Sequence, residues 1–92
     1  MKHSEHLPVY SQIAYDIASK IVSGEIQEGQ RFSGRSLMSS QYGVSSETIR
    51  RSLNLLSDMQ VISIQQNVGS VVRSRQRAAE YVEQYKANQD LR

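Results

Sequence analysis

The segment from Ser45 to Arg51 carries the polar side chains best suited to chemistry, in the order Ser-Ser-Glu-Thr-Ile-Arg-Arg. A nucleophile with a neighbouring base is not expected, because the two histidines, His3 and His6, lie in the amino-terminal tail. The segment offers hydroxyl, carboxylate and guanidinium groups, which bind by hydrogen bonds and charge. A guanidinium matches a phosphate, and it also matches the O6 and N7 edge of guanine. We therefore expect binding, and not catalysis, from this segment.

An amphipathic helix over residues 45–59 would hold these side chains on one face. Its apolar residues recur at the i, i+4 and i+7 spacing of a buried face: Ile49, Leu53 and Leu56. Ser45 is placed to cap the first turn, and the helix dipole favours a carboxylate at Glu47. The opposite face then carries Glu47, Arg50, Asn54 and, further round, Arg51.

Two further helices are expected before this one. An apolar stripe predicts a helix over 9–23 that ends at Gly24, and a shorter helix over 35–42 ends at Gly43. The stretch between them is expected to be a turn around Gly29. The predicted core combines the stripes of the first and third helices with one residue from the following strand: Tyr10, Ile13, Ile17, Ile21, Ile49, Leu53, Leu56 and Ile62.

The remainder of the chain predicts a hairpin and a last helix. Residues 60–74 form two β-rich runs around an Asn/Gly tip at 66–69, which is typical of a two-stranded hairpin. Residues 73–92 are helical in propensity and carry a weak apolar stripe, so they could dock on the domain, begin a dimer helix or link to a further domain.

These elements predict an α+β, mainly α fold, namely a winged helix-turn-helix of three helices and a two-stranded wing, with a C-terminal helix. An ordinary helical hairpin in a small bundle would share its first part. The expected organisation is a flexible tail over 1–7, a domain over 8–74, and a C-terminal helix, linker or dimerisation stub over 75–92.

Composition excludes several other classes of protein. The chain has 92 residues, no cysteine and a net charge of +2, so we expect neither a disulfide framework nor a metal or cofactor site. No apolar run approaches the roughly 18 residues that span a bilayer, and the amino terminus has no secretory signal, so we expect no membrane partner and a cytoplasmic location. Arginines cluster at 31–51 and 73–77, as in polyanion binders, although arginines that only solvate helices would cluster similarly.

Three stretches of the chain carry a family pattern: PVYSQIAYDIASKIVSGEIQEGQRF, GVSSETIRRSLNLLSDMQVI and VGSVV. They contain a Y-x-Q-I helix, an S-G-x-I-x-x-G-x-R turn, a G-V-S-x-x-T-[VI]-R helix and a wing with a glycine. In this order and spacing, from Pro8 to Val72, they resemble the DNA-binding domain of the GntR family of bacterial transcription regulators. The resemblance implies a repressor that binds double-stranded operator DNA. Because one reading head is small and paired half-sites raise affinity, we expect a palindromic operator and a homodimer or higher homo-oligomer of the full-length protein.

The resemblance also implies which residues contact DNA. Ser45, Ser46, Glu47, Thr48 and Arg50 would lie on the leading turns of a helix in the major groove. Arg50 would read guanine or clamp a phosphate, whereas Glu47 would accept from cytosine N4 or serve the helix dipole and point away. Thr48 would contact phosphate or pack at the helix turn.

Other contacts would position the protein without reading sequence. Arg35 and Arg51 are expected to contact phosphates. Asn67 and Gly69 would follow the backbone or enter the minor groove from the wing, and turn geometry alone would also explain Gly69. Arg73, Arg75 and Arg77 would either touch DNA or form a solvated helix start.

This chain departs from the family pattern at three places. Ser33-Gly34-Arg35-Ser36 stands in place of the usual P-S-E-R, so its arginine is displaced by one position. Ser46 and Glu47 stand where arginine and threonine are common, and the wing tip carries no positive charge. These departures imply a different operator and not a loss of DNA binding.

A narrower resemblance is carried by SSETIRRSLNLLSDMQVI and RAAEYVEQY, which look like the BusR-type repressors of that family. Those repressors control osmolyte uptake genes and take cyclic di-AMP as effector through a domain that these 92 residues do not include. The alternative function is a winged-helix protein-interaction module without sequence-specific DNA binding. Steep weakening by salt would distinguish DNA binding from a hydrophobic interface.

Overall fold

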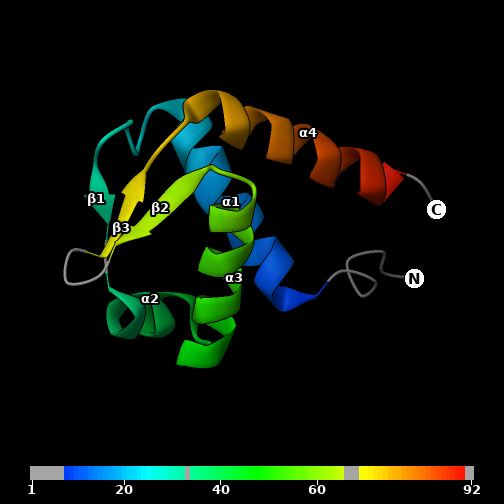
Figure 1. Cartoon of the computed structure of the whole chain (residues 1–92). Helices are drawn as coiled ribbons and strands as arrows, with labels where there is room; N and C mark the ends of the chain where they lie inside the picture. Colours follow the sequence, from blue (N-terminus) through cyan, green and yellow to red (C-terminus); the bar gives the residue numbers. More distant parts are fainter. Residues whose placement is uncertain (1–7, 33, 66–68, 91–92) are drawn as a thin grey trace.

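Four helices and three short strands make up the residues that the computed structural model describes, which are 8–32, 34–65 and 69–90. In chain order the elements are α1 (Val9–Ser23), β1 (Arg31–Phe32), α2 (Arg35–Tyr42), α3 (Ser46–Asp58), β2 (Ile62–Gln65), β3 (Gly69–Val72) and α4 (Arg75–Asp90). Figure 1 shows α1 in the middle of the molecule, between α3 and α4, with the strands at the far end from the two termini. The predicted winged helix-turn-helix with a C-terminal helix is confirmed.

The core lies where α1 meets α3 and α4. All predicted core residues except Tyr10 are buried: Ile13, Ile17, Ile21, Ile49, Leu53, Leu56 and Ile62. Burial of one such side chain contributes about 1.5–3 kcal/mol relative to its exposure to water. The helix-period stripes of α1 and α3 therefore supply most of the driving force that holds these two helices together.

The ends of the first three helices follow from local capping. α1 and α2 have the predicted bounds and end at Gly24 and Gly43, whose φ angles of +90° and +68° are left-handed. α3 begins one residue later than predicted because Ser45 is its cap: Ser45 Oγ accepts a hydrogen bond of 3.2 Å from the Thr48 N–H.

Gln60 ends α3 in the left-handed conformation that glycine adopts after α1 and α2. Its φ is +65°. The N–H groups of Gln60 and Val61 donate to the carbonyls of Ser57 and Leu56 over 3.0 and 2.9 Å, the hydrogen-bond pair of a Schellman motif. The left-handed conformation costs a residue with a Cβ roughly 1–2 kcal/mol, so α3 ends at a strained position.

The wing is the hairpin of β2 and β3, and β1 adds a third strand to it. The sheet order is β1-β3-β2 with antiparallel pairing throughout, and Arg31 lies opposite Val71. The predicted hairpin is present, but the turn expected around Gly29 continues into a strand. Two hydrogen bonds of 3.0 Å join it to β3, from Gly29 N–H to the Val72 carbonyl and from Val72 N–H to the Gln30 carbonyl.

α4 docks along α1 through its apolar stripe. Ala78, Tyr81, Val82 and Tyr85 are buried. The ring of Tyr85 stacks on that of Tyr15, with 4.3 Å between ring centroids. The Tyr81 hydroxyl donates to the Ser11 carbonyl over 3.0 Å, and burial raises the pKa of this hydroxyl to about 12. The stripe that suggested a dimer helix is thus covered by this chain's own α1.

No helix in residues 8–32, 34–65 and 69–90 has the length and apolar character needed to cross a bilayer.

Replacement of Gln60 by glycine is expected to stabilise the fold. Gln60→Gly removes the left-handed strain but adds freedom to the unfolded chain, which costs about 0.4–1 kcal/mol, so we expect a net gain of about 0.5–1 kcal/mol. Urea unfolding followed by circular dichroism measures the change. The matched control is Gly43→Ala, where an added Cβ meets nothing within 4 Å. Gly43→Ala should lose stability because of the φ of residue 43 alone. A change of stability in the same direction in both variants would contradict the interpretation that residue 60 is strained.

Candidate nucleic-acid interface

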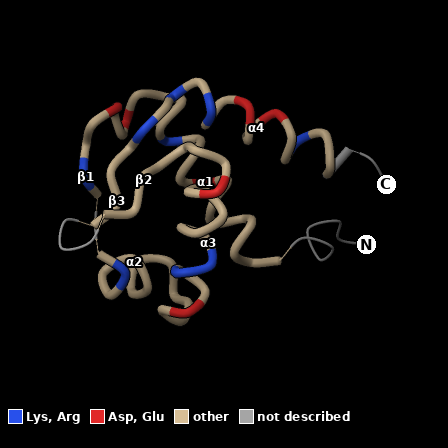
Figure 2. The backbone as a smooth tube through the Cα atoms, in the orientation of Figure 1, with Lys and Arg blue, Asp and Glu red and all other residues tan. Residues whose placement is uncertain are grey.

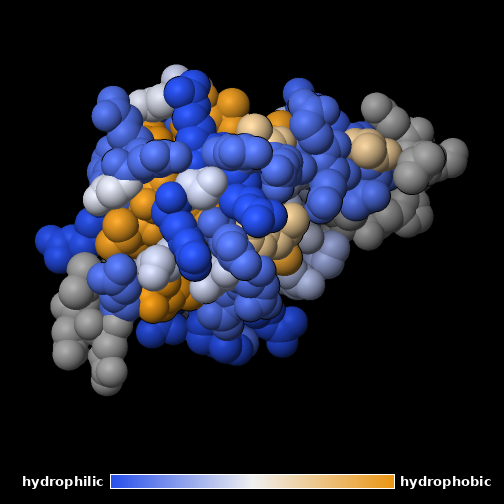
Figure 3. Space-filling view, turned by 45° about the horizontal axis from the view of Figure 1, so that its top comes forward, coloured by the Kyte–Doolittle hydropathy of each residue, from blue (hydrophilic) through white to orange (hydrophobic). Residues whose placement is uncertain are grey.

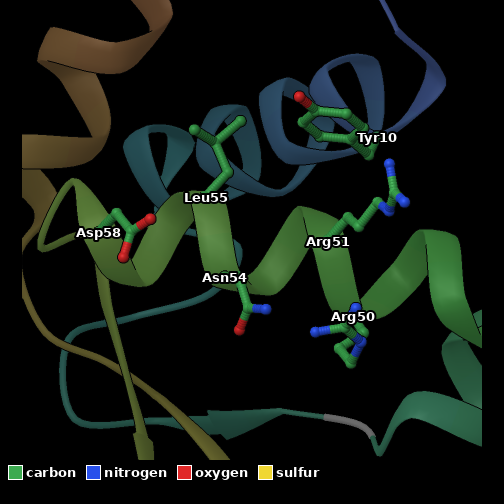
Figure 4. Close-up of a pocket in the computed structure, with 6 residues that line it drawn as sticks. All are labelled: Tyr10, Arg50, Arg51, Asn54, Leu55 and Asp58. Atoms are coloured by element: carbon green, nitrogen blue, oxygen red, sulfur yellow. The ribbon is translucent and has the colours of Figure 1, made fainter.

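The outward face of α3 presents two guanidinium groups and an amide. The side chains of Arg50 and Arg51 are 46% and 60% exposed. In Figure 4, Arg50 and Asn54 project from the same side of α3, while Arg51 projects toward Tyr10 on α1. Since Ile49 and Leu53 on the opposite face are buried, rotation of α3 about its axis would expose apolar residues. The polar face is therefore held outward by the core.

Glu47 binds both arginines of this face. The Arg50 Nε–H donates to Glu47 Oε1 over 3.0 Å, and Arg50 Nη2 donates to Oε2, so the two groups meet in a parallel pair of bonds. Arg51 Nε donates to the same Oε2 over 3.4 Å. The hydrogen bond from Arg50 is the main cause that lowers the pKa of Glu47 to about 2, and that of Arg50 is raised.

The depressed pKa fixes how this cluster depends on pH. Glu47 is ionised at every pH well above 2. Because its folded pKa is below the unfolded value, the ion pair is complete above the unfolded pKa and is lost only as pH falls toward 2. Near neutral pH, Arg50, Arg51 and Glu47 together carry one net positive charge.

The hydroxyls at the start of α3 have different environments. Ser45 Oγ caps the helix and lies 3.1 Å from Thr48 Oγ1, so these two predicted contact residues are already bonded to each other. Thr48 is half-buried, as the packing alternative for it requires, whereas Ser46 is exposed. Ser46 is therefore the hydroxyl of this turn most open to a ligand.

A shallow hollow runs along α3 beside the first turn of α1. Its lining residues are Tyr10, Arg50, Arg51, Asn54, Leu55 and Asp58. Tyr10 was predicted to lie in the core, and this is wrong: it is half-buried and its ring faces the hollow (Figure 4). Tyr10 lies in the first turn of α1, at the edge of the contact with α3, and lines the hollow instead of the core.

The wing carries a cation, Arg31, that the sequence placed in a basic cluster but did not assign to the wing. Because β1 pairs with β3, Arg31 lies beside Gly69: a Cβ at Gly69 would be 4.0 Å from the Cδ atom of Arg31. Gly69 has a φ of +99°, which favours glycine. Asn67 lies outside the described residues. The last residue of the S-G-x-I-x-x-G-x-R block was the available signal for Arg31.

Basic residues lie on three of the elements that surround the start of α3. Figure 2 shows Lys/Arg colour on β1, at the start of α2 and on α3. These positions correspond to Arg31, Arg35, Arg50 and Arg51, all exposed. α2, which begins at Arg35, packs against α3, which carries Arg50 and Arg51.

The basic cluster after the wing has a different role. Arg75 Nε and Nη2 donate to the Val22 carbonyl over 3.0 and 2.6 Å, and the Arg75 N–H donates to Glu28 Oε2 over 2.9 Å. Arg75 thus fastens the start of α4 to the end of α1. Arg77 pairs with Glu80 at 3.5 Å, and Arg73 is exposed.

The visible apolar surface is divided into small groups. Figure 3 shows hydrophobic residues emerging between hydrophilic ones. The large hydrophobics that are exposed within the described part of the chain lie on separate elements, Val9 on α1, Leu37 on α2 and Ile64 on β2. Singly exposed apolar residues are normal on soluble proteins. In the same part of the chain no group of three or more acidic or histidine side chains could hold a metal ion.

Comparison with known proteins gives consistent matches over most of the chain. Residues 9–72 match the family model described as "Bacterial regulatory proteins, gntR family". The mannosyl-D-glycerate transport/metabolism system repressor MngR of Escherichia coli K12 is 34% identical over 68 residues, which are 74% of this chain and 28% of MngR.

Solved structures match in the same region. BusR of S. agalactiae, in complex with its busAB-promotor DNA, has a TM-score of 0.81 and 31% identity over 87% of this chain and 39% of its own. AraR(DBD), in complex with operator ORX1, has a TM-score of 0.69 and 32% identity over 72% of this chain and 80% of its own. The chain thus spans well under half of MngR and BusR.

Removal of the Ser45 hydroxyl should destabilise the domain before any ligand is considered. Ser45→Ala loses the cap of α3 and should cost about 1 kcal/mol in urea unfolding. Ser46→Ala, one residue on and without the capping bond, should stay within about 0.5 kcal/mol of the parent chain. A larger loss for Ser46→Ala than for Ser45→Ala would show that the cap is assigned to the wrong residue.

Proposed function

Since this chain belongs to the gntR family of bacterial regulatory proteins, we propose that it binds double-stranded operator DNA and regulates transcription as a repressor. One observation carries the proposal: α3 buries its apolar face on α1 while Arg50, Arg51 and Asn54 stand outward. The same fold in BusR is seen in complex with promoter DNA, and MngR is a repressor. The family is one of regulators and not of enzymes.

In this proposal α3 lies in the major groove, which is about 12 Å wide and admits one helix. Arg50 reads guanine through O6 and N7, and Asn54, on the same side of α3, is placed to read adenine through N6 and N7. Ser46 faces the same groove. The sequence predicts that Asn54 faces outward but assigns it no contact.

The other basic residues hold the backbone of the duplex. Arg35 at the start of α2 and Arg51 on α3 contact phosphates on either side of the groove. The wing lies beside them, and Arg31 supplies there the positive charge that the tip lacks. Gly69 and Asn67 follow the sugar-phosphate backbone or the minor groove.

Assembly and regulation extend the same proposal. Two copies are expected to occupy two half-sites of a palindromic operator, because a single reading helix specifies few base pairs. The contacts between copies must lie outside the α4 stripe, since α1 covers it. An effector, for which cyclic di-AMP is the candidate, would act through a further domain. Because the operator DNA of a bacterial regulator lies in the cytoplasm, we also propose a cytoplasmic location.

Arg50→Ala is the sharpest test of the groove assignment. Loss of a bidentate guanine contact should weaken binding to a duplex selected from a random pool by about 5- to 150-fold and relax the sequence preference at one position. Fluorescence anisotropy measures the affinity over a salt series, and the same measurement on duplexes changed at single positions gives the sequence preference. Lys86→Ala, which removes one exposed charge from α4, is the control and should change affinity little. Unchanged binding by Arg50→Ala would contradict the assignment.

Arg51→Ala should behave differently, because a phosphate contact carries no base information. Affinity should fall by a similar factor on selected and unselected duplexes, and the slope of log affinity against log salt should decrease by about 1. A change in base preference with Arg51→Ala would show that the two arginines have exchanged roles. Binding that is insensitive to salt in the parent chain would favour the protein-interaction alternative.

A further inference from the structure

The contacts of Glu47 suggest a role that differs from both roles considered for it. We infer that Glu47 is a positioning residue, which holds the Arg50 guanidinium by one edge and thereby sets base discrimination; this rests on the proposed function. Neither a cytosine contact nor a helix-dipole role requires Glu47 to bond to an arginine. The structure instead shows Glu47 bound to Arg50 and Arg51 together.

The geometry leaves Arg50 able to read a base while it is held. Glu47 takes the Nε hydrogen and one hydrogen of Nη2. The Nη1 group and the second Nη2 hydrogen remain at the end of the guanidinium, and this end can donate two parallel bonds to guanine O6 and N7. The pair is built within α3 itself, since residues three apart on a helix are neighbours.

Holding the side chain before DNA arrives increases specific binding. A free arginine must give up its rotamer freedom when it docks, and a restrained planar fork loses less of it for each hydrogen bond formed. Because Glu47 stays ionised well below neutral pH, the restraint is present at neutral pH, and salt weakens it because the pair is exposed.

The same carboxylate lowers attraction to DNA of any sequence. It cancels one of the two positive charges of Arg50 and Arg51 at the face that meets the phosphates, and non-specific binding depends on such charges. The lost charge lowers specific and non-specific affinity alike, whereas the restraint on Arg50 raises specific affinity alone, so the ratio of specific to non-specific affinity rises through the restraint.

The test compares Glu47→Ala and Glu47→Gln with the parent chain on two probes, a duplex selected from a random pool and the same duplex with the Arg50-dependent guanine pair replaced. We expect affinity for the replaced duplex to rise several-fold at low salt. The ratio of affinities for the two duplexes should fall by about tenfold. In an Arg50→Ala background, substitution of Glu47 should no longer change this ratio, because the residue through which it acts is gone.

The chain offers a matched control at the Arg77–Glu80 pair of α4. That pair has the same i, i+3 spacing and side chains 51% and 50% exposed, against 46% and 54% for Arg50 and Glu47. Glu80→Ala changes net charge equally and should leave the ratio unchanged. A second readout needs no DNA: the Arg50 Nε–H signal in NMR should show greater mobility in Glu47→Ala and no change in Glu80→Ala.

Three results would overturn the inference. The first is a loss of preference at a cytosine position with the guanine preference intact, which would mean that Glu47 reads a base directly. The second is reduced stability with an unchanged ratio, which would leave Glu47 only a role at the helix terminus. The third is an unchanged Arg50 signal in Glu47→Ala. Failure of the parent chain to select any duplex would instead reject the proposed function, so the two failures are distinguishable.

Discussion

The packing of α3 on α1 determines where every candidate contact residue lies. Ser52 is fully buried in this contact, and its Oγ is 2.9 Å from the Tyr10 carbonyl oxygen and 3.1 Å from the Thr48 carbonyl oxygen, to either of which it can donate. A buried hydroxyl without such an acceptor would cost about 1–3 kcal/mol. The bond therefore favours one register of α3 on α1, and Ile49, Leu53 and Leu56 around it exclude the others. The outward direction of Arg50 follows from this register, because it lies on the opposite side of the same helix.

α1 transmits that register to the rest of the domain. Two side chains of α4 bond to carbonyls near the two ends of α1: Tyr81 to that of Ser11 and Arg75 to that of Val22. With α3 on one side of α1 and α4 on another (Figure 1), the directions of the two outer helices are fixed relative to each other. Any movement of α4 must then either break these bonds or carry α1, and with it the contact face of α3.

The parts of the fold that the sequence predicted are those set by neighbours along the chain. The bounds of α1 and α2 followed from helix-period stripes that end at glycines, and the cap at Ser45 followed from its place before an apolar helix. The features that the sequence did not predict depend on contacts between residues far apart in the chain. β1 is only two residues long, too short for an alternating pattern, and it exists because β3 lies beside it. The fastening of α4 by Arg75 to a carbonyl 53 residues away has no local signal either.

The candidate site shows the same division. Its residues on α3 were predictable because a single helix places them on one face. Arg31 was not, since it reaches the wing only through the pairing of β1 with β3. The prediction for Tyr10 was wrong because its spacing matches the α1 stripe, whereas its place in the first turn of α1 leaves it half-buried. The Glu47–Arg50 bond lay within the reach of sequence reasoning, since the two are three residues apart. The spacing alone does not decide whether Glu47 bonds to Arg50 or faces DNA.

The bonding of Glu47 to two arginines on α3 keeps the net charge of this face low, and the net charge of the whole chain is also low. A net charge of +2 gives little general attraction to a polyanion, so the position of each charge matters more than their sum. An acidic residue bonded to two arginines would be a disadvantage if affinity alone were required, because its negative charge weakens the phosphate contacts nearby. It becomes an advantage when a regulator must leave the many non-specific sites of a chromosome, since the useful quantity is then the ratio between specific and non-specific binding. The Glu47 carboxylate subtracts charge from both kinds of complex and adds order to only one of them, which is the combination that such a ratio requires.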